Sequence, residues 1–262
     1  MRKSSSEPVN FNLIESLTKN NFLFKDLDRS LLSKYLTPER TIDEKLYSSR
    51  PIYTAFGTNT SLEYLYVIVK GGPVVVRSTP LDRIIDITYA NSCFGMRNMA
   101  LSFGNVSRTF PSLVEAYKTA DVVKIPLDII KTIHQESELF RQRYGAMFEL
   151  QEKFQYHLLN CSTYPPQAVA ALLRALVYQE RELGNQPQDD GVFLFDLPVE
   201  IIAKACQLNH RTVEQVLKGM MKVGILKSPK GSHSDLVYVL NPEELKAVYG
   251  ATRDKVSWWP LK

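Results

Sequence analysis

Residues 197–226 read LPVEIIAKACQLNHRTVEQVLKGMMKVGIL, and this stretch decides how the chain is interpreted. The pattern predicts a first helix over 198–205, with Pro198 at a tolerated first-turn position. Its inward-facing residues are Ile201, Ile202 and Ala205. A second helix is predicted to begin at Asn209, which is a good N-cap. Its inward-facing residues, at three- and four-residue steps, are Val213, Val216, Leu217 and Met220. Two short amphipathic helices joined by a tight turn indicate a helix-turn-helix.

The outer face of the second predicted helix is polar and mostly basic. It carries His210, Arg211, Glu214, Gln215, Lys218 and Lys222. Arginine and glutamine side chains can pair with guanine and adenine edges in the major groove, whereas lysine mainly holds phosphate. Residues 197–232 contain six basic and two acidic residues, a net charge of +4 that equals the charge of the whole chain. The candidate DNA-contacting residues are therefore Asn209, His210, Arg211, Thr212, Gln215 and Lys218. The alternative is a pair of core helices with a solvated charged face.

The segments that follow suggest a wing and a tail. Gly224 is suited to end the second helix in a left-handed conformation. Residues 236–240 (LVYVL) are predicted to form a wing strand after a hairpin turn at 229–232. The last residues, 251–262, form an aromatic tail with Trp258 and Trp259, which either packs back on the domain or offers a docking patch.

The composition of the 262-residue chain fits a globular protein of two domains, with 44% hydrophobic and 23% charged residues. No apolar run approaches the length of a membrane span, and no signal core follows the N-terminus, so we expect a cytoplasmic protein without a membrane partner. Three scattered cysteines and four scattered histidines form no metal-binding pattern. Because no catalytic motif is found either, we predict no enzyme activity, no metal and no cofactor.

Three segments precede the long helical part of the chain. Residues 1–10 are polar and predicted to be disordered, and 11–36 predict a short helical lead-in with a break near Lys25 and Asp26. Short β-type runs then follow at 52–54, 62–69, 74–76, 84–89 and 122–125. Hairpin turns between short strands predict an α+β protein whose N-terminal domain, residues 11–126, is an antiparallel sandwich or barrel.

A long helical pattern occupies 127–162. Six of its residues recur at alternating steps of four and three, namely Phe140, Tyr144, Met147, Gln151, Phe154 and Leu158. This heptad spacing predicts a dimerisation seam, with the polar Gln151 fixing its register. The alternative is a helix that lies against its own domain's core. We prefer the homodimer because paired helix-turn-helix units bind two half-sites of DNA.

The order of an N-terminal β-roll (11–126), a long helix (127–162) and a winged helix-turn-helix (163–250) resembles the cyclic-AMP receptor protein and fumarate–nitrate regulator (CRP/FNR) family of bacterial transcription factors. The resemblance covers almost the whole chain. The stretches that carry it are Glu63 to Gly72 (EYLYVIVKGG), Cys93-Phe94-Gly95, Val114-Glu115-Ala116 and Val122 to Pro126 (VVKIP). It implies a DNA-binding regulator controlled by a small molecule.

The cyclic-nucleotide site of the family is not reproduced. Met96-Arg97 follows Gly95 where the family has a glutamate, and Phe110-Pro111 stands where an Arg-Ser pair would sit. We therefore do not expect cyclic AMP. The candidate effector site, for a different small anion, consists of Phe94, Gly95, Met96, Arg97 and Arg108. The alternative is that both arginines are solvated and the site has lost its ligand.

The resemblance also places His210, Arg211 and Gln215 at base-contacting positions, where common family members have Arg, Glu and Arg. Arg211 replaces an acceptor for cytosine with a donor suited to guanine, so we expect a different operator sequence. Gln207 stands where family members often have glycine, and a positive φ there would be strained. The alternative function is a protein-interaction module of the same fold that docks on another regulator or on RNA polymerase, with the Trp258-Trp259 tail in its surface.

Overall fold

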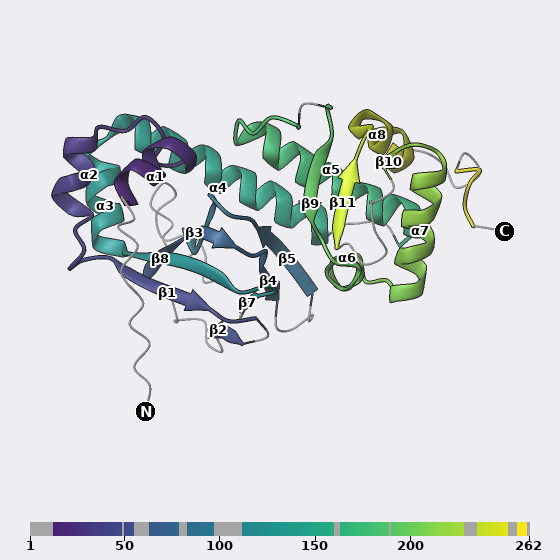
Figure 1. Ribbon diagram of the computed structural model, residues 1–262, viewed down its shortest axis with the longest axis horizontal. Coiled ribbons are helices and arrows are strands. Elements are labelled where there is room, and N and C mark those ends of the chain that lie inside the picture. Colours follow the sequence, from purple (N-terminus) through teal and green to yellow (C-terminus); the bar gives the residue numbers. More distant parts are fainter. Residues whose placement is uncertain are drawn as a thin grey trace.

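A computed structural model of the protein describes residues 13–48, 50–54, 63–78, 83–96, 112–159, 163–188, 190–227, 235–250 and 256–260. The protein is of mixed α and β structure, and every strand pairing is antiparallel. We call α1 to α3 with β1 to β8 the N-terminal unit, and α5 to α8 with β9 to β11 the C-terminal unit. The helix α4 (Glu138–Leu159) runs along the N-terminal unit and ends beside α5 (Figure 1). No helix within the described ranges is long and apolar enough to cross a membrane.

Two four-stranded sheets form the N-terminal unit. In the first, the order is β1 (Ile42–Leu46), β8 (Ala120–Pro126), β3 (Tyr64–Gly71) and β6 (Cys93–Phe94). In the second, the order is β2 (Pro51–Thr54), β7 (Ser112–Ala116), β4 (Val74–Ser78) and β5 (Arg83–Thr88). This arrangement confirms the predicted antiparallel sandwich and the five predicted strand runs. β1, β6 and β7 were not predicted.

The strand β3 in the first sheet is buried on both faces, which explains its continuous apolar run. Tyr66 and Ile68 point into the space between the two sheets, where they join a core that includes Phe94 and Val122. Leu65 and Val67 belong to a different core, formed with the helices that cover the outer face. Alternate residues of a strand face opposite sides, so a strand covered on both sides is apolar throughout.

Helices cover the outer face of this sheet. They are α1 (Leu13–Asn20), α2 (Arg29–Tyr35), α3 (Leu127–Glu136) and the first half of α4. The predicted helix over 127–162 is two helices, because Ser137 adopts an extended conformation. Its hydroxyl then accepts a hydrogen bond from the backbone N–H of Phe140 (3.2 Å), which starts α4. The predicted helical lead-in with a break is confirmed by α1 and α2.

The predicted dimerisation seam lies inside the subunit, and this prediction is wrong. Five of the six residues are at most 3% exposed, namely Phe140, Tyr144, Met147, Phe154 and Leu158. The sixth, Gln151, is half-buried and donates from Nε2 to the carbonyl oxygen of Cys93 (3.0 Å). A helix that packs on its own sheet shows the same three- and four-residue spacing as one in a coiled coil. The alternative of packing on its own core is therefore confirmed.

The C-terminal unit combines four helices with a three-stranded sheet. Its elements are α5 (Pro165–Glu182), β9 (Phe193–Asp196), α6 (Val199–Cys206), α7 (His210–Lys222), β10 (Leu226–Lys227), β11 (Leu236–Val239) and α8 (Pro242–Gly250). Its sheet has the order β10, β11, β9. The core of this unit continues into the N-terminal unit, since Val75, Ile84 and Ile87 pack in the same cluster as residues of α5 and α6.

Candidate nucleic-acid interface

The two helices predicted from residues 197–226 are α6 and α7, and both lie within one or two residues of the predicted bounds. Asn209 is the N-cap of α7, and its Oδ1 accepts a hydrogen bond from the backbone N–H of Thr212 (2.8 Å). Gln207 ends α6 with φ 53° and ψ 42°. This is the positive φ considered from the sequence for this position in the turn. A side chain in this left-handed region is strained. The turn nevertheless forms without a glycine at this position.

The C-terminal end of α7 has the hydrogen bonds of a Schellman motif. Gly224, with φ 77°, donates to the carbonyl of Met221 (3.1 Å), and Ile225 donates to the carbonyl of Met220 (3.0 Å). The chain then turns directly into β10, which pairs with β11 in the register Leu226 to Val239. The predicted wing strand is thus confirmed, whereas the predicted turn at 229–232 lies outside the described residues.

One face of α7 is firmly anchored. Val213, Val216 and Met220 are 0% exposed. On the flank of the helix, the indole of Trp258 covers Gly219, where an added Cβ would lie 2.7 Å from Cζ3 of that ring. The tail around Trp258 therefore packs back on its own domain. These contacts fix the rotation of α7 about its axis.

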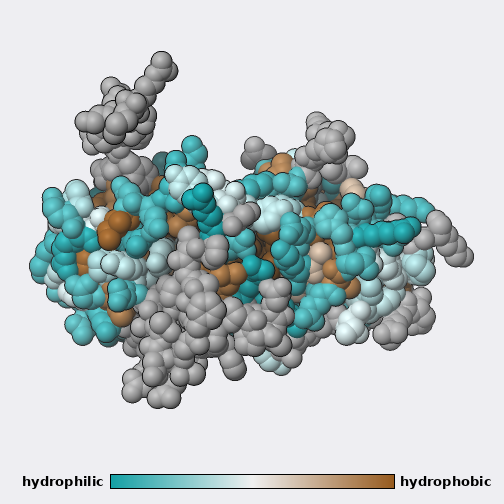
Figure 2. All heavy atoms as spheres, turned by 90° about the horizontal axis from the view of Figure 1, so that it is seen from below, coloured by the Kyte–Doolittle hydropathy of each residue, from teal (hydrophilic) through white to brown (hydrophobic). Residues whose placement is uncertain are grey.

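The opposite face of α7 is open and basic. Arg211, Lys218 and Lys222 are exposed, and none has an ion-pair or hydrogen-bond partner in the part of the chain that the structure describes. His210 is exposed as well, with Nδ1 3.9 Å from Oε1 of Glu214. Thr212 and Gln215 are half-buried at the edge of this face. Hydrophilic residues predominate over the end of the molecule that carries α7 (Figure 2). The face thus presents donors and three cations that no group in the described ranges neutralises.

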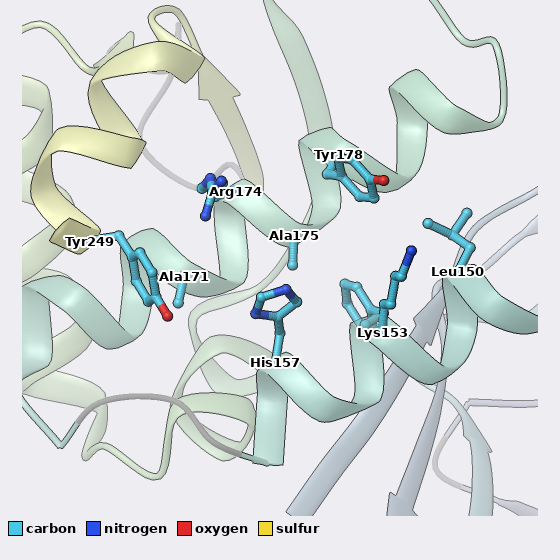
Figure 3. A pocket seen from close by; sticks show the side chains of 9 residues that line it. Leu150, Lys153, His157, Ala171, Arg174, Ala175, Tyr178 and Tyr249 are labelled. Atoms are coloured by element: carbon cyan, nitrogen blue, oxygen red, sulfur yellow. The ribbon is translucent and has the colours of Figure 1, made fainter.

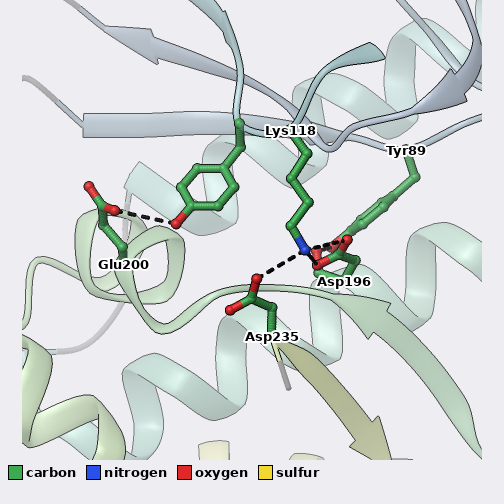
Figure 4. A network of polar contacts seen from close by, with 6 residues as sticks. Tyr89, Lys118, Asp196, Glu200 and Asp235 are labelled. Carbon is green, nitrogen blue, oxygen red and sulfur yellow. Dashed lines mark hydrogen bonds and ion pairs between the residues drawn. The ribbon is translucent and has the colours of Figure 1, made fainter. Parts of the chain in front are cut away.

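A polar junction joins the C-terminal unit to the N-terminal unit (Figure 4). Lys118, in the turn between β7 and β8, donates to both carboxylate oxygens of Asp196 (2.6 and 2.8 Å) and lies 3.0 Å from Asp235 Oδ2. Burial lowers the pKa of Lys118, but the hydrogen bonds to Asp196 and Asp235 outweigh it and leave the pKa above its ordinary value. The lysine therefore remains charged between two carboxylates that flank the sheet of the C-terminal unit.

Two tyrosines complete this junction. The hydroxyl of Tyr117 donates to Oε2 of Glu200 on α6 (3.3 Å), and that of Tyr89 donates to the carbonyl oxygen of Asp196 (3.2 Å). Burial and the nearby Asp196 carboxylate raise the pKa of Tyr89 above its usual range, so it acts as a neutral donor. No local sequence pattern indicated these contacts, which all join residues at least 78 positions apart.

The candidate effector residues are only partly described. Phe94 is 2% exposed and stacks on Tyr66, with ring centroids 4.7 Å apart. Met96 is 0% exposed, and its carbonyl accepts from the hydroxyl of Tyr144 (3.2 Å). These two side chains are core residues, and the candidate effector site at this segment stays a prediction. Gly95 lies between them with φ 98°. Arg97 and Arg108 lie outside the described residues.

The architecture defines a class of protein, in which a β-roll is joined by a long helix to a winged helix-turn-helix. No protein-family model matches the sequence. A search of curated proteins finds no match either.

Solved structures with this fold do match. FixK2 from Bradyrhizobium japonicum has a TM-score of 0.58 at 16% identity, over 81% of this chain and 98% of that chain. A CooA mutant from Carboxydothermus hydrogenoformans has a TM-score of 0.58 at 15% identity, over 92% and 97%. A transcriptional regulator of the CRP family from Thermus thermophilus has a TM-score of 0.51 at 16% identity, over 80% and 97%. The resemblance to the CRP/FNR proteins is therefore confirmed at the level of the fold.

Proposed function

We propose that the protein is a sequence-specific DNA-binding transcriptional regulator of the CRP/FNR type. The observation that carries this proposal is the open face of α7, where Arg211, Lys218 and Lys222 have no partner among the described residues. Unpaired cations on an anchored helix are suited to a polyanion, because each phosphate contact releases a counterion from the duplex. The likeness in fold to the transcriptional regulator from Thermus thermophilus supports the same proposal.

We assign different roles to the residues of this face. Arg211 and Gln215 read base edges, since their side chains can make paired hydrogen bonds to guanine and adenine, and His210 assists them as a donor. Lys218 holds phosphate. Asn209 and Thr212 position the start of α7, because the Asn209 side chain caps the helix at the backbone N–H of Thr212. In this proposal Thr212 also contacts the DNA backbone at the N-terminus of the helix.

The protein acts in this proposal as a homodimer, because two helix-turn-helix units one DNA turn apart bind two half-sites. One face of α4 packs against the core of its own subunit, so in this proposal the dimer uses the opposite face of the helix. That face has its own exposed stripe at alternating steps of three and four, namely Leu139, Gln142, Ala146, Glu149, Lys153 and Tyr156. Leu139 and Tyr156, near the two ends of this stripe, are 38% and 67% exposed.

The dimer is tested by a charge placed in the middle of this stripe. Ala146→Glu is expected to shift the sedimentation coefficient from dimer to monomer. The control Lys131→Glu, on the exposed side of α3, keeps the dimer. A wild-type chain that sediments as a monomer at micromolar concentration contradicts the homodimer.

DNA binding is tested first by selection of binding sites from a pool of random duplexes at low salt. With the selected duplex, Arg211→Ala and Gln215→Ala are each expected to cost about 1 to 3 kcal/mol and to relax the preferred sequence. Lys218→Ala weakens binding to all duplexes alike and lowers the slope of log affinity against log salt by about one. Lys131→Ala is the matched control. A wild-type protein that binds no duplex at low salt would refute DNA binding and favour docking on another regulator or on RNA polymerase.

Control by a small anion other than cyclic AMP completes the proposal. Arg97 and Arg108 are the residues that the sequence predicts to hold it. Mass spectrometry of molecules carried through purification tests this step, with Arg97→Gln and Arg108→Gln expected to lose the bound anion.

A further inference from the structure

A cavity of about 270 Å³ opens between α4, α5 and α8, on the side of the molecule where the long helix meets the C-terminal unit (Figure 3). Its apolar lining comes from Leu150 and Phe154 of α4 and from Ala171 and Ala175 of α5, which are all at most 9% exposed. None of these residues belongs to the open face of α7 or to the candidate effector residues around Gly95. The cavity is therefore separate from both proposed binding sites, although one of its lining residues, Lys153, also belongs to the proposed dimer stripe on α4.

The polar lining of the cavity is basic and aromatic. It consists of Lys153, His157, Arg174, Tyr178 and Tyr249. No acidic side chain lines the cavity among the residues that the structure describes. Lys153 is partly neutralised, since its Nζ lies 2.6 Å from Oε1 of Glu149.

Arg174 is the group that gives the cavity its charge preference. Its guanidinium carbon lies 5.7 Å from the ring centroid of Tyr249. No carboxylate of the described chain forms an ion pair with it. Cation–π stacking holds the guanidinium in place but leaves its N–H groups free to donate. An uncompensated arginine beside a histidine and two phenols is suited to bind a carboxylate.

The size and lining of the cavity restrict the body of such a ligand. Its volume is near the lower end for small-molecule sites, about 300 Å³, which favours a small ligand. The flat rings of Phe154, Tyr178 and Tyr249 favour a flat apolar body, because aromatic groups pack best against each other's faces and edges. From this geometry we propose that the cavity binds a small aromatic carboxylate, with the carboxylate on Arg174 and the ring over Ala171 and Ala175.

This inference does not depend on DNA binding, and its test uses the full chain alone. Benzoate is the probe, and benzamide is its neutral counterpart of the same shape. Benzoate is expected to bind with a Kd on the order of 1 mM or lower by calorimetry. In NMR spectra, the largest shifts are expected at the methyl groups of Ala171 and Ala175. Benzamide binds at least tenfold more weakly.

Two variants test the residues. Arg174→Gln is expected to weaken benzoate binding by about tenfold or more, because a hydrogen bond to a charged group is lost. Ala175→Leu fills the cavity and abolishes binding while it leaves every charge in place. Lys246→Gln, which removes an exposed charge from α8 outside the cavity, leaves the affinity unchanged. Circular dichroism confirms that each variant is folded.

The proposal is overturned if benzoate does not bind, if benzamide binds equally well, or if Arg174→Gln has no effect. It is also overturned if the wild-type protein does not bind benzoate and Arg174→Gln changes the sedimentation coefficient. In that case the cavity is filled by a second copy of the chain.

Discussion

Lys118 and Asp196 form an ion pair with Nζ and Oδ1 2.6 Å apart, although the first residue lies in a turn of the β-roll and the second ends a strand of the C-terminal unit. Asp235 stands 3.0 Å from the same lysine, at the start of β11. One lysine thus connects the N-terminal unit to the two strands that flank α6 and α7. Any change in how the two units are docked must break or rebuild these contacts.

We predict that Lys118→Gln loosens the docking of the two units. The pairs are partly exposed, with 41% of the Lys118 side chain and 31% of the Asp196 side chain accessible, so each contributes only about 0.2 to 1 kcal/mol. The loss of both should speed amide hydrogen exchange in β9 and β11 severalfold and leave the exchange of β3 and β8 unchanged.

The matched control is Lys45→Gln, since Lys45 pairs with Asp121 entirely within the β-roll, 3.6 Å apart. That variant should leave exchange in β9 and β11 as it is in the wild type. Equal exchange in Lys118→Gln and wild type would mean that the apolar contacts of Val75, Ile84 and Ile87 and the two tyrosine hydrogen bonds hold the junction without the lysine.

Gln207→Gly is predicted to stabilise the protein. Gln207 has φ 53°, where glycine is free of the strain that a side chain suffers. We expect the free energy of unfolding to rise by about 0.5 to 1 kcal/mol in urea titrations. The same substitution at Gln142, within α4, should instead lower it by about 1 kcal/mol. A loss of stability in Gln207→Gly would show that the side chain makes a contribution beyond its backbone conformation.

The sequence was sufficient to predict those elements whose side chains alternate between core and solvent. The helices α6 and α7 were predicted closely because each has an apolar stripe and a local start signal, such as Asn209. β1 was missed because its residues 42–46 (IDEKL) are exposed at four of five positions. The strand β9 and the helix α8 were also missed, although Phe193-Leu194-Phe195 and the start Asn241-Pro242-Glu243 are signals that indicate them.

Two features were beyond the reach of local patterns. The spacing from Phe140 to Leu158 shows that one side of α4 is buried but not what covers it, since a sheet and a second helix require the same stripe. The contacts of Lys118 with Asp196 and Asp235 depend on how two units dock. Charged residues that meet only in the folded chain leave no periodic trace in the sequence.

We predict that Gly219→Ala and Trp258→Ala are strongly coupled. An alanine usually favours a helix over glycine by about 1 kcal/mol, but at Gly219 the new methyl group would meet the ring of Trp258. Gly219→Ala alone should therefore displace the tail, lower the free energy of unfolding and shift the tryptophan fluorescence to longer wavelength.

In the Trp258→Ala background, Gly219→Ala should become stabilising, so that a double-mutant cycle gives a coupling of about 1 kcal/mol or more. Gly145→Ala in α4 is the control, because an added Cβ there meets nothing within 4 Å. Additive effects of the two changes would show that the tail does not rest on α7 in solution.

Asp86 is predicted to make the stability of the protein depend on pH. Burial raises the pKa of this carboxyl from 3.8 to about 6, and its Oδ1 is enclosed without a hydrogen-bond partner among the described residues. Between these two pKa values the folded state holds a proton that the unfolded state has released. The contribution of Asp86 is therefore most favourable below about pH 4 and is lost as the pH rises through 6.

The ionised carboxylate should cost the folded state about 1 to 3 kcal/mol at pH 7, and Asp86→Asn should recover part of this cost. Urea titrations from pH 4 to pH 8 measure the difference in free energy of unfolding between variant and wild type. That difference should grow in favour of the variant up to about pH 6 and then stay level, because both states of the wild type are ionised above it. Asp43→Asn, on the exposed part of β1, should give no such rise, and a flat difference for Asp86→Asn would mean that its carboxylate is solvated in the folded protein.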